Sequence, residues 1–236
     1  IVSGNGLYLA ESKKVKILTG NTMTAASCLH HLDRYIESRM RPAPDPLVIA
    51  IAGANGNIGS GLAGCLNWDA YQDCPVILAG NHQKKLELLR NKLFARDRKV
   101  LCTTDLFDLK NADIIISCTN TNDPLLFPHH LDAGKPYFII DIAVPGSVSG
   151  EVKRMKNVQF CKEASTVFMP DDPDFVISTH TPVGKIFCCA AEALVAALYD
   201  VRLPLKGHLK PEAIKLMMEL GQLESLFNQP EYAPVV

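Results

Sequence analysis

Apolar and polar residues along the chain form blocks that predict strands and helices in turn. Runs of four to eight almost wholly apolar residues are typical of strands buried on both faces of a parallel sheet. Such runs occupy residues 47–53, 75–80, 99–104, 113–119, 137–144 and 158–162. Apolar residues at helical spacing follow the first two runs, at residues 57–68 and 83–95. This alternation predicts an α/β fold, a Rossmann-type doubly wound parallel sheet.

Helical patterns also flank the predicted sheet on both sides. Residues 24–39 read as a helix that ends before the Pro-rich segment RPAPDP, residues 41–46. After the last apolar run, we expect a helix with Thr181 as its N-cap and Pro182 in its first position, and another from Pro211. We therefore divide the chain into an N-terminal segment and helix (1–45), a Rossmann domain (46–165) and a C-terminal helical segment (166–236).

The composition narrows the classes of partner and the cellular compartment. Lys and Arg number 24 and Asp and Glu number 25, so no global charge favours nucleic acid or an anionic membrane. No apolar run reaches the roughly 20 residues that span a bilayer, so we expect no stable membrane insertion. The eight cysteines are scattered without metal-ligand spacing, which favours free thiols in a reducing cytoplasm and no metal site. Because the chain starts at Ile1, we expect it to be part of a longer polypeptide.

A glycine-rich loop directly follows the first predicted strand. Gly53, Gly56 and Gly59 stand at the junction of strand and helix with the spacing GxxGxxG, a variant of the dinucleotide fingerprint. A pyrophosphate would bind at the helix N-terminus, where free N–H groups favour an anion. The loop residues between the glycines are also expected to contact the cofactor: Asn55, Asn57 and Ile58.

The end of the second predicted strand distinguishes NADP from NAD. NAD sites carry an acidic residue there to bind the ribose hydroxyls, whereas this strand ends at Gly80 and Asn81. Lys84 and Lys85 follow closely and favour the 2′-phosphate of NADPH. The alternative is that both lysines are ordinary solvent-exposed residues on one face of a helix.

Two further strand ends should meet the glycine loop at the same edge of the sheet. Ligands of open α/β sheets bind at the carboxyl ends of the strands. Cys118 and Thr119 end one strand, and Ile142 and Val144 end another, so these residues are candidates to line the nicotinamide half. Cys118 could equally be a small buried side chain.

Two chemically active clusters lie outside the predicted sheet. Thr19, Gly20, Asn21 and Thr22 precede the first helix, where they could cap it or hydrogen-bond a substrate or cofactor. Cys188 and Cys189 are adjacent in an apolar segment, so they point about 100° apart on a helix and only one can face a given site. Both cysteines could also be core residues, with Glu192 paired to a buried base or acting as a structural anchor.

Several motifs together resemble one known family. They are LTGNTMTAA, GANGNIGS, VILAG followed by NHQKKL, ADIIIS, and KIFCCAAEAL. With them the chain resembles the cyanobacterial-type long-chain fatty acyl-[acyl-carrier protein] reductases, which carry a similar Phe-x-Cys-x-Ala-Glu-Ala segment. The middle of the chain, including ADIIISCTNTNDPLL and FIIDIAVPGSVSGEVKRMKNV, is similar to the nucleotide domain of glutamyl-tRNA reductases.

The resemblance implies NADPH-dependent reduction of an acyl thioester to an aldehyde, with Cys189 as the acyl-accepting nucleophile. Lys185, four residues earlier on the same helix face, would favour the thiolate, and His180 would protonate the departing thiol. The expected partner is an acyl carrier protein or a CoA thioester.

The chain also departs from this family. The region that precedes the TGN motif in the family is almost absent here, and Asn81 replaces an arginine. Two other functions therefore remain open: a dehydrogenase of the shikimate or glutamyl-tRNA reductase type, and a non-catalytic NADP-binding module.

Overall fold

The structure, a computed structural model, describes residues 16–39, 46–161, 163–177 and 181–228. The chain forms two compact units: unit 1 comprises residues 1–30 and 163–236, and unit 2 comprises residues 31–162. Helix α1 (Asn21–Ser38) contributes its first residues to unit 1 and its last residues to unit 2. The three-segment division expected from the sequence stays a prediction, and nearly all of the Pro-rich segment lies outside the described residues.

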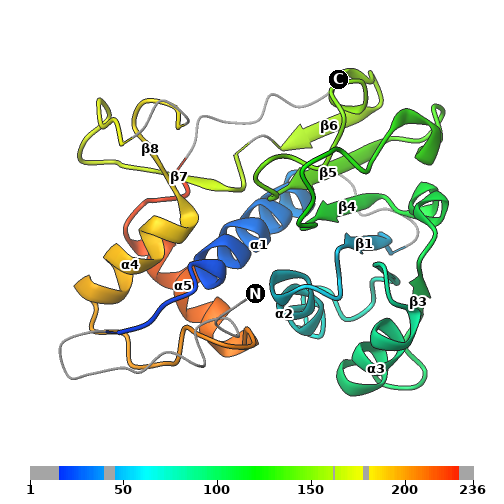
Figure 1. The fold of residues 1–236 in the computed structure, drawn as a ribbon, viewed down its shortest axis with the longest axis horizontal. Helices are drawn as coiled ribbons and strands as arrows, with labels where there is room; N and C mark the ends of the chain where they lie inside the picture. Colours follow the sequence, from blue (N-terminus) through cyan, green and yellow to red (C-terminus); the bar gives the residue numbers. More distant parts are fainter. Residues whose placement is uncertain (1–15, 40–45, 162, 178–180, 229–236) are drawn as a thin grey trace. The chain divides into compact units, whose positions relative to one another are not determined.

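Unit 2 contains a six-stranded parallel sheet with the order β3-β2-β1-β4-β5-β6 (Figure 1). This is the Rossmann strand order, so the predicted fold class is confirmed. Each predicted apolar run contains one strand: β1 (Ile49–Ala52), β2 (Val76–Ala79), β3 (Val100–Thr103), β4 (Ile114–Ser117), β5 (Tyr137–Asp141) and β6 (Val158–Cys161).

The burial of the strands explains why their sequences are apolar. Every residue of β1, β2, β4 and β5 is buried, as expected for central strands covered on both faces. The outer strands β3 and β6 are partly exposed. Helix α2 (Asn57–Cys65) lies against β1 and helix α3 (Gln83–Leu93) lies against β3. Three short 3₁₀ helices connect the remaining strands: η1 (Leu106–Asn111), η2 (Pro128–His130) and η3 (Val152–Arg154).

Unit 1 combines helices with a small antiparallel sheet. Strand β7 (Thr166–Phe168) pairs with β8 (Lys185–Phe187), and helix α4 (Cys188–Leu198) follows β8 without a linker. Helix α5 (Pro211–Leu223) packs against α4. The start of α1 completes this unit.

Two helix starts predicted from the sequence are wrong. Helix α1 begins at Asn21 and not at Thr24, so Asn21 and Thr22 of the polar cluster lie in its first turn. No helix begins at Thr181, because Gly184 takes a left-handed backbone (φ 73°) and the next three residues pair with β7. Helix α4 therefore begins six residues later than expected, at Cys188 and not at Pro182.

The described helices include none with both the length and the apolar character needed to cross a bilayer.

Candidate functional site

The glycine loop joins β1 to α2 in unit 2. Gly53 has a φ of 90°, and a Cβ on it would lie 2.8 Å from the carbonyl oxygen of Cys118. A Cβ on Gly59 would lie only 2.3 Å from the carbonyl oxygen of Gly53. Both positions therefore require glycine: the first for its backbone conformation, and both for the close approach of neighbouring backbone.

The loop presents the free N-terminus of α2. The backbone N–H of Gly53 and that of Ala54 both donate to Ala79, at 2.9 and 3.0 Å, which fastens the loop to β2. Gly56 is the N-cap, and no side chain caps the helix. The first N–H groups of a helix have no intrahelical acceptor and favour negative charge. Asn57, Ile58 and Gly59 supply these groups, as the sequence predicts for a pyrophosphate site.

Two buried oxygen atoms beside the loop support a polar ligand. Asn55 Oδ1 and Thr119 Oγ1 are buried and have no hydrogen-bond partner among the residues that the structure describes. Asn55 is held by its amide nitrogen, which donates to the carbonyl of His82 at 3.2 Å. The backbone nitrogen of Thr119 would lie 3.0 Å from a Cβ on Gly53. Because buried polar atoms are normally hydrogen-bonded, these two oxygens fit a site that a dinucleotide completes.

The residues after β2 lie where an adenosine ribose would be expected. Asn81, Lys84 and Lys85 are exposed, and both lysines stand in the first turn of α3. No acidic side chain occurs between the end of β2 and this turn. The segment after β2 therefore has no carboxylate that would repel a 2′-phosphate. Neither Lys84 nor Lys85 forms an ion pair with a carboxylate of the described residues.

The ends of β4 and β5 adjoin each other on the other side of β1. Cys118 directs its thiol to the carbonyl of Ala52 at 3.1 Å. Burial raises the pKa of this thiol to about 12, and the Asp141 carboxylate adds to the effect, so Cys118 stays protonated at neutral pH. Ile142 is buried, whereas Val144 is 64% exposed.

Asp141 at the end of β5 is a site residue that the sequence reasoning missed. Its carboxylate accepts hydrogen bonds from Ser147 Oγ and from the backbone N–H of Val148, both at 3.0 Å. Ser147 Oγ also lies 2.5 Å from Ser117 Oγ, at the end of β4. These bonds fix the two strand ends side by side. The signal was present, because an acidic residue inside the apolar run YFIIDIAV needs hydrogen-bond partners.

In unit 1, the two adjacent cysteines differ in environment. Cys188 is buried, its thiol points to the carbonyl of Ala164 at 3.6 Å, and burial raises its pKa to about 12. Cys189 is the only exposed cysteine of the eight, all of which lie in the described residues. It stands in the first turn of α4, and not two turns into a helix as expected. Of the two adjacent cysteines, only Cys189 is accessible to a ligand from solvent.

The start of α1 packs directly against Cys189. A Cβ on Gly20 would lie 2.3 Å from Cys189 Cβ, and Gly20 has a φ of 74°. Glu192, one turn further along α4, is fully buried and accepts backbone N–H bonds from Gly20, Thr22 and Met23 at 2.9, 2.7 and 2.9 Å. Glu192 thus anchors the N-terminus of α1, and its partners are backbone N–H groups and not a base.

The structure does not support the predicted position of Lys185, and His180, the other residue proposed to assist Cys189, lies outside the described residues. Lys185 lies on β8 and not one helical turn before Cys189, and its ammonium forms an ion pair with Glu163 at 2.6 Å. The helical argument for its role is therefore wrong.

The polar residues at the start of α1 make bonds within unit 1. Thr19 Oγ1 donates to the carbonyl of Leu205 at 3.1 Å, and Thr22 is fully buried. Asn21 donates its backbone N–H to Thr19 Oγ1 at 3.3 Å. These contacts are those of a helix start, and a substrate or cofactor role for the four residues stays a prediction. Among the described residues, no three His, Cys, Asp or Glu side chains are grouped to hold a metal ion.

The strand order and the glycine loop at a free helix N-terminus are those of a Rossmann-type α/β fold. Residues 48–162 match the family model described as shikimate / quinate 5-dehydrogenase, and these residues include the whole parallel sheet. The match covers most of unit 2. It ends before unit 1 and therefore does not include helix α4.

Comparison with solved structures gives distant similarities. L-tryptophan dehydrogenase from Nostoc punctiforme shares 14% identity (86% of this chain, 52% of that chain, TM-score 0.47). Quinate dehydrogenase from Corynebacterium glutamicum, in complex with NAD, shares 12% identity (89% and 57%, TM-score 0.36). Glucose dehydrogenase from Haloferax mediterranei shares 13% identity (86% and 48%, TM-score 0.38). The chain spans about half the length of these proteins. No curated protein matches the chain, so the resemblance to acyl-[acyl-carrier protein] reductases rests on its motifs alone.

Proposed function

We propose that the chain is an NADP-dependent dehydrogenase that binds its cofactor on the glycine loop of unit 2. The observation that carries this proposal is the loop itself: Gly53 and Gly59 allow close backbone packing there, no side chain caps α2, and Asn55 Oδ1 and Thr119 Oγ1 are buried without a partner in the described residues. The family match over residues 48–162 supports the same class of activity.

The residues of unit 2 have distinct tasks in this proposal. The first-turn N–H groups of α2 bind the pyrophosphate, and Asn55 and Thr119 offer their unpartnered oxygens to the cofactor's hydroxyl or amide donors. Ile142 supplies apolar surface beside the nicotinamide half, and Asp141 holds the ends of β4 and β5 in register. When bound, NADPH supplies the hydride, and NADP⁺ accepts it in the reverse direction.

A double substitution tests the preference for NADP. The Lys84→Gln/Lys85→Gln variant should lose at least about tenfold in NADPH affinity, since each lysine would form a charge-assisted bond to the 2′-phosphate. Its NADH affinity should stay unchanged. Fluorescence titration of the reduced cofactors measures both values.

Lys92→Gln is the matched control, because Lys92 is an exposed lysine in the last turn of the same helix. Equal losses of NADPH affinity in all the variants, or equal losses of affinity for NADPH and NADH, would show that the two lysines do not bind the 2′-phosphate. Tight NADPH binding without turnover of any hydroxy acid, amino acid or thioester would instead favour a non-catalytic module.

A second candidate function is reduction of an acyl thioester, supplied by an acyl carrier protein or CoA. The exposure of Cys189 favours it, together with an apolar pocket of about 190 Å³ on α4 and the neighbouring segments of unit 1. In this reaction the Cys189 thiolate attacks the thioester carbonyl, the carrier thiol leaves with a proton, and the acyl group stays on Cys189 until a hydride displaces it as an aldehyde. Cys189 itself does not line this pocket. Its lining comprises seven apolar residues, Met169, Pro170, Ala191, Leu194, Val195, Leu198 and Leu226, and three acidic ones, Asp171, Asp172 and Glu224.

Mass spectrometry after incubation with an acyl-CoA, without cofactor, tests this step. We expect one added acyl group on the wild type and none on Cys189→Ser, because Cys188 is buried and its thiol is protonated at neutral pH. Cys74→Ser, which alters a half-buried cysteine of unit 2, should keep the adduct. An unmodified wild type, or an adduct that survives Cys189→Ser, would exclude the cysteine mechanism and leave the dehydrogenase proposal unaffected.

A further inference from the structure

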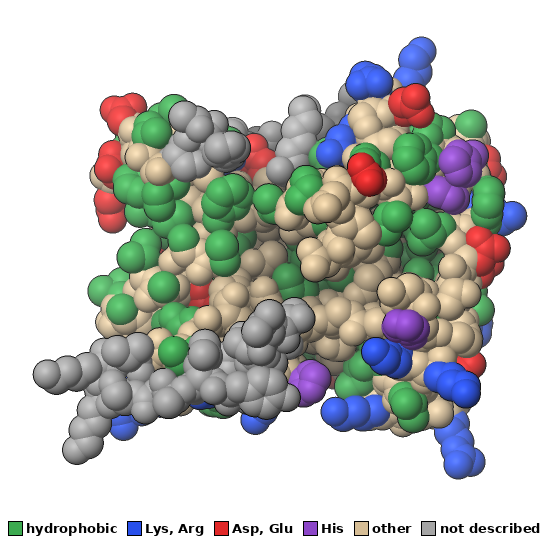
Figure 2. Space-filling view, in the orientation of Figure 1, with side chains coloured by type: hydrophobic (Ala, Val, Ile, Leu, Met, Phe, Trp, Pro, Cys, Tyr) green, Lys and Arg blue, Asp and Glu red, His purple; other side chains and the backbone are tan. Residues whose placement is uncertain are grey.

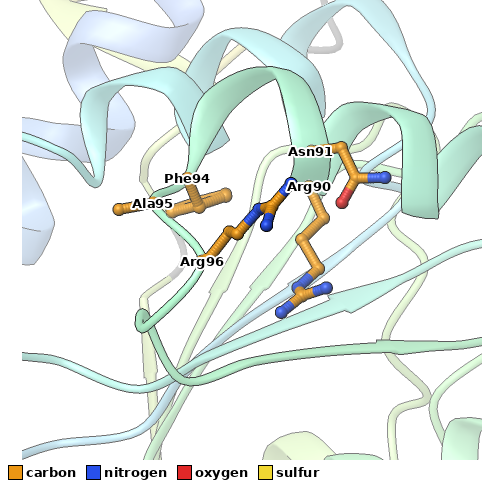
Figure 3. Close-up of a pocket in the computed structure, with 5 residues that line it drawn as sticks. All are labelled: Arg90, Asn91, Phe94, Ala95 and Arg96. Atoms are coloured by element: carbon orange, nitrogen blue, oxygen red, sulfur yellow. The ribbon is translucent and has the colours of Figure 1, made fainter.

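A second pocket in unit 2 lies away from the glycine loop, at the C-terminal end of α3. It has a volume of about 320 Å³ and is lined by Arg90, Asn91, Phe94, Ala95 and Arg96. Figure 3 shows Arg96 reaching back from the turn after α3 toward the helical turn that carries Arg90 and Asn91. The five residues that line this pocket include two arginines and one asparagine, and Phe94 and Ala95 supply its apolar lining. A volume near 320 Å³ is at the lower end of pockets that bind small molecules.

The surface around this pocket is strongly basic. Residues 83–99 contain seven Lys and Arg but only two acidic residues. Figure 2 shows Lys and Arg side chains gathered over α3. The whole chain has a net charge of −1, so this segment concentrates positive charge that the rest of the protein offsets. Such a local excess attracts anions.

The helix dipole explains part of this charge but not the pocket. Cations are favoured in the last turn of a helix, and Arg90 and Lys92 stand there. Arg96, however, lies three residues beyond the end of α3. Neither arginine has a carboxylate within 4 Å in the described part of the chain.

Arg90 carries an unused donor at this site. Its Nε is buried and finds no hydrogen-bond partner in the described residues. The side chain lies beside β3, since its charge opposes the burial that raises the pKa of the Cys102 thiol. A buried N–H without an acceptor is costly, so a ligand that accepts from it would be stabilising.

From these contacts we infer that the pocket binds a small anion that carries a phosphate group. Guanidinium groups present planar pairs of N–H donors that match phosphate oxygens, and Asn91 adds two amide donors. Phe94 and Ala95 would contact a carbon skeleton attached to the phosphate.

This site is separate from the proposed cofactor site. Lys84 and Lys85 lie in the first turn of α3, whereas the pocket lies at its end, and an 11-residue helix is roughly 16 Å long. The inference therefore does not depend on NADP binding.

Isothermal titration with inorganic phosphate, at constant ionic strength and with saturating NADP⁺, tests the site. We expect one phosphate per chain, and affinity weakened by at least about tenfold in Arg96→Gln, since one charge-assisted donor pair is lost. Arg90→Gln should weaken it similarly, but Arg96 is exposed and its substitution should leave the fold intact. Lys92→Gln removes the same charge from the same surface outside the pocket and should bind as the wild type.

Three outcomes would overturn the inference. The first is that phosphate binds no more tightly than chloride. The second is that Lys92→Gln and Arg96→Gln lose phosphate affinity equally, which would indicate a general positive potential of this surface and not a specific site. The third is binding to phosphatidic acid vesicles without binding to inorganic phosphate, which would place the anion site on the open surface and not in the pocket.

Discussion

Gly59→Ala is expected to weaken dinucleotide binding, because the new Cβ would lie 2.3 Å from the carbonyl oxygen of Gly53 and 2.8 Å from Ala54 Cα. Neither backbone atom can move without displacing the loop from the start of α2. The N–H groups that would bind the pyrophosphate then lose their common direction. We expect the dissociation constant for NADPH to rise by at least about tenfold, the equivalent of one charge-assisted hydrogen bond. Fluorescence titration measures the affinity.

Gly134→Ala is the matched control for the Gly59 substitution. Gly134 is exposed in unit 2, and a Cβ there would only touch Asp132 Oδ1 at 3.4 Å, so the variant should bind NADPH as the wild type. Gly59→Ala must also retain the circular dichroism spectrum of the wild type, which separates a displaced loop from an unfolded unit. A folded Gly59→Ala protein with unchanged NADPH affinity would refute the assignment of the loop.

The sheet and the glycine loop could be predicted because their signals are local. A continuous apolar run such as LVIAIAG predicts a doubly buried strand wherever it occurs, and β1 lies inside it. The glycines follow this strand directly, so the strand–loop–helix context could be read from adjacent residues. In the structure, the backbone of Gly53 lies close to that of Gly59 and to that of Cys118, the residue after β4, as the motif requires.

The surroundings of Cys189 could not be predicted because they depend on distant partners. Strand β8 has only three residues and forms by pairing with β7, which begins 19 positions earlier. No local sequence pattern predicts this pairing. Lys185 was assigned to a helix for this reason, whereas on β8 it reaches Glu163. Asp141 is a different case: the acidic residue inside an apolar run was a signal of buried hydrogen bonds, but the loop that carries its partner Ser147 has no regular pattern to identify that partner.

Removal of the Glu192 carboxylate is expected to cause the largest loss of stability in unit 1. The carboxylate accepts three backbone N–H bonds from the first residues of α1, across 169 to 172 positions of sequence. In Glu192→Ala these buried N–H groups lose their acceptor, at a cost of about 3 kcal/mol or more. Glu192→Gln keeps one acceptor oxygen but turns an amide N–H toward the helix, so we expect a loss of about 1–2 kcal/mol. Urea denaturation followed by circular dichroism measures both.

Glu219→Gln is the control for these variants, because Glu219 is exposed on α5 in the same unit and should change stability by less than about 0.5 kcal/mol. The anchor also bears on Cys189, since Gly20 is bonded to Glu192 and packs on Cys189. Glu192→Ala should therefore alter the rate at which Cys189 reacts with a thiol reagent, whereas Glu219→Gln should not. Equal stability of Glu192→Ala and Glu219→Gln would disprove the anchoring role.

The pH dependence of Glu192 gives an independent test of the same contact. Burial raises the pKa of the Glu192 carboxyl, although its three backbone N–H bonds oppose the rise. The folded state then holds this proton more tightly than the unfolded state, in which Glu titrates near about 4.3. The stabilising contribution is complete below that value and is lost as the pH rises through the folded pKa. The stability advantage of the wild type over Glu192→Ala should therefore narrow from pH 4 toward neutral pH in urea titrations at a series of pH values. An advantage that widens over this range would mean that the N–H bonds outweigh burial and that the folded carboxyl has a lowered pKa.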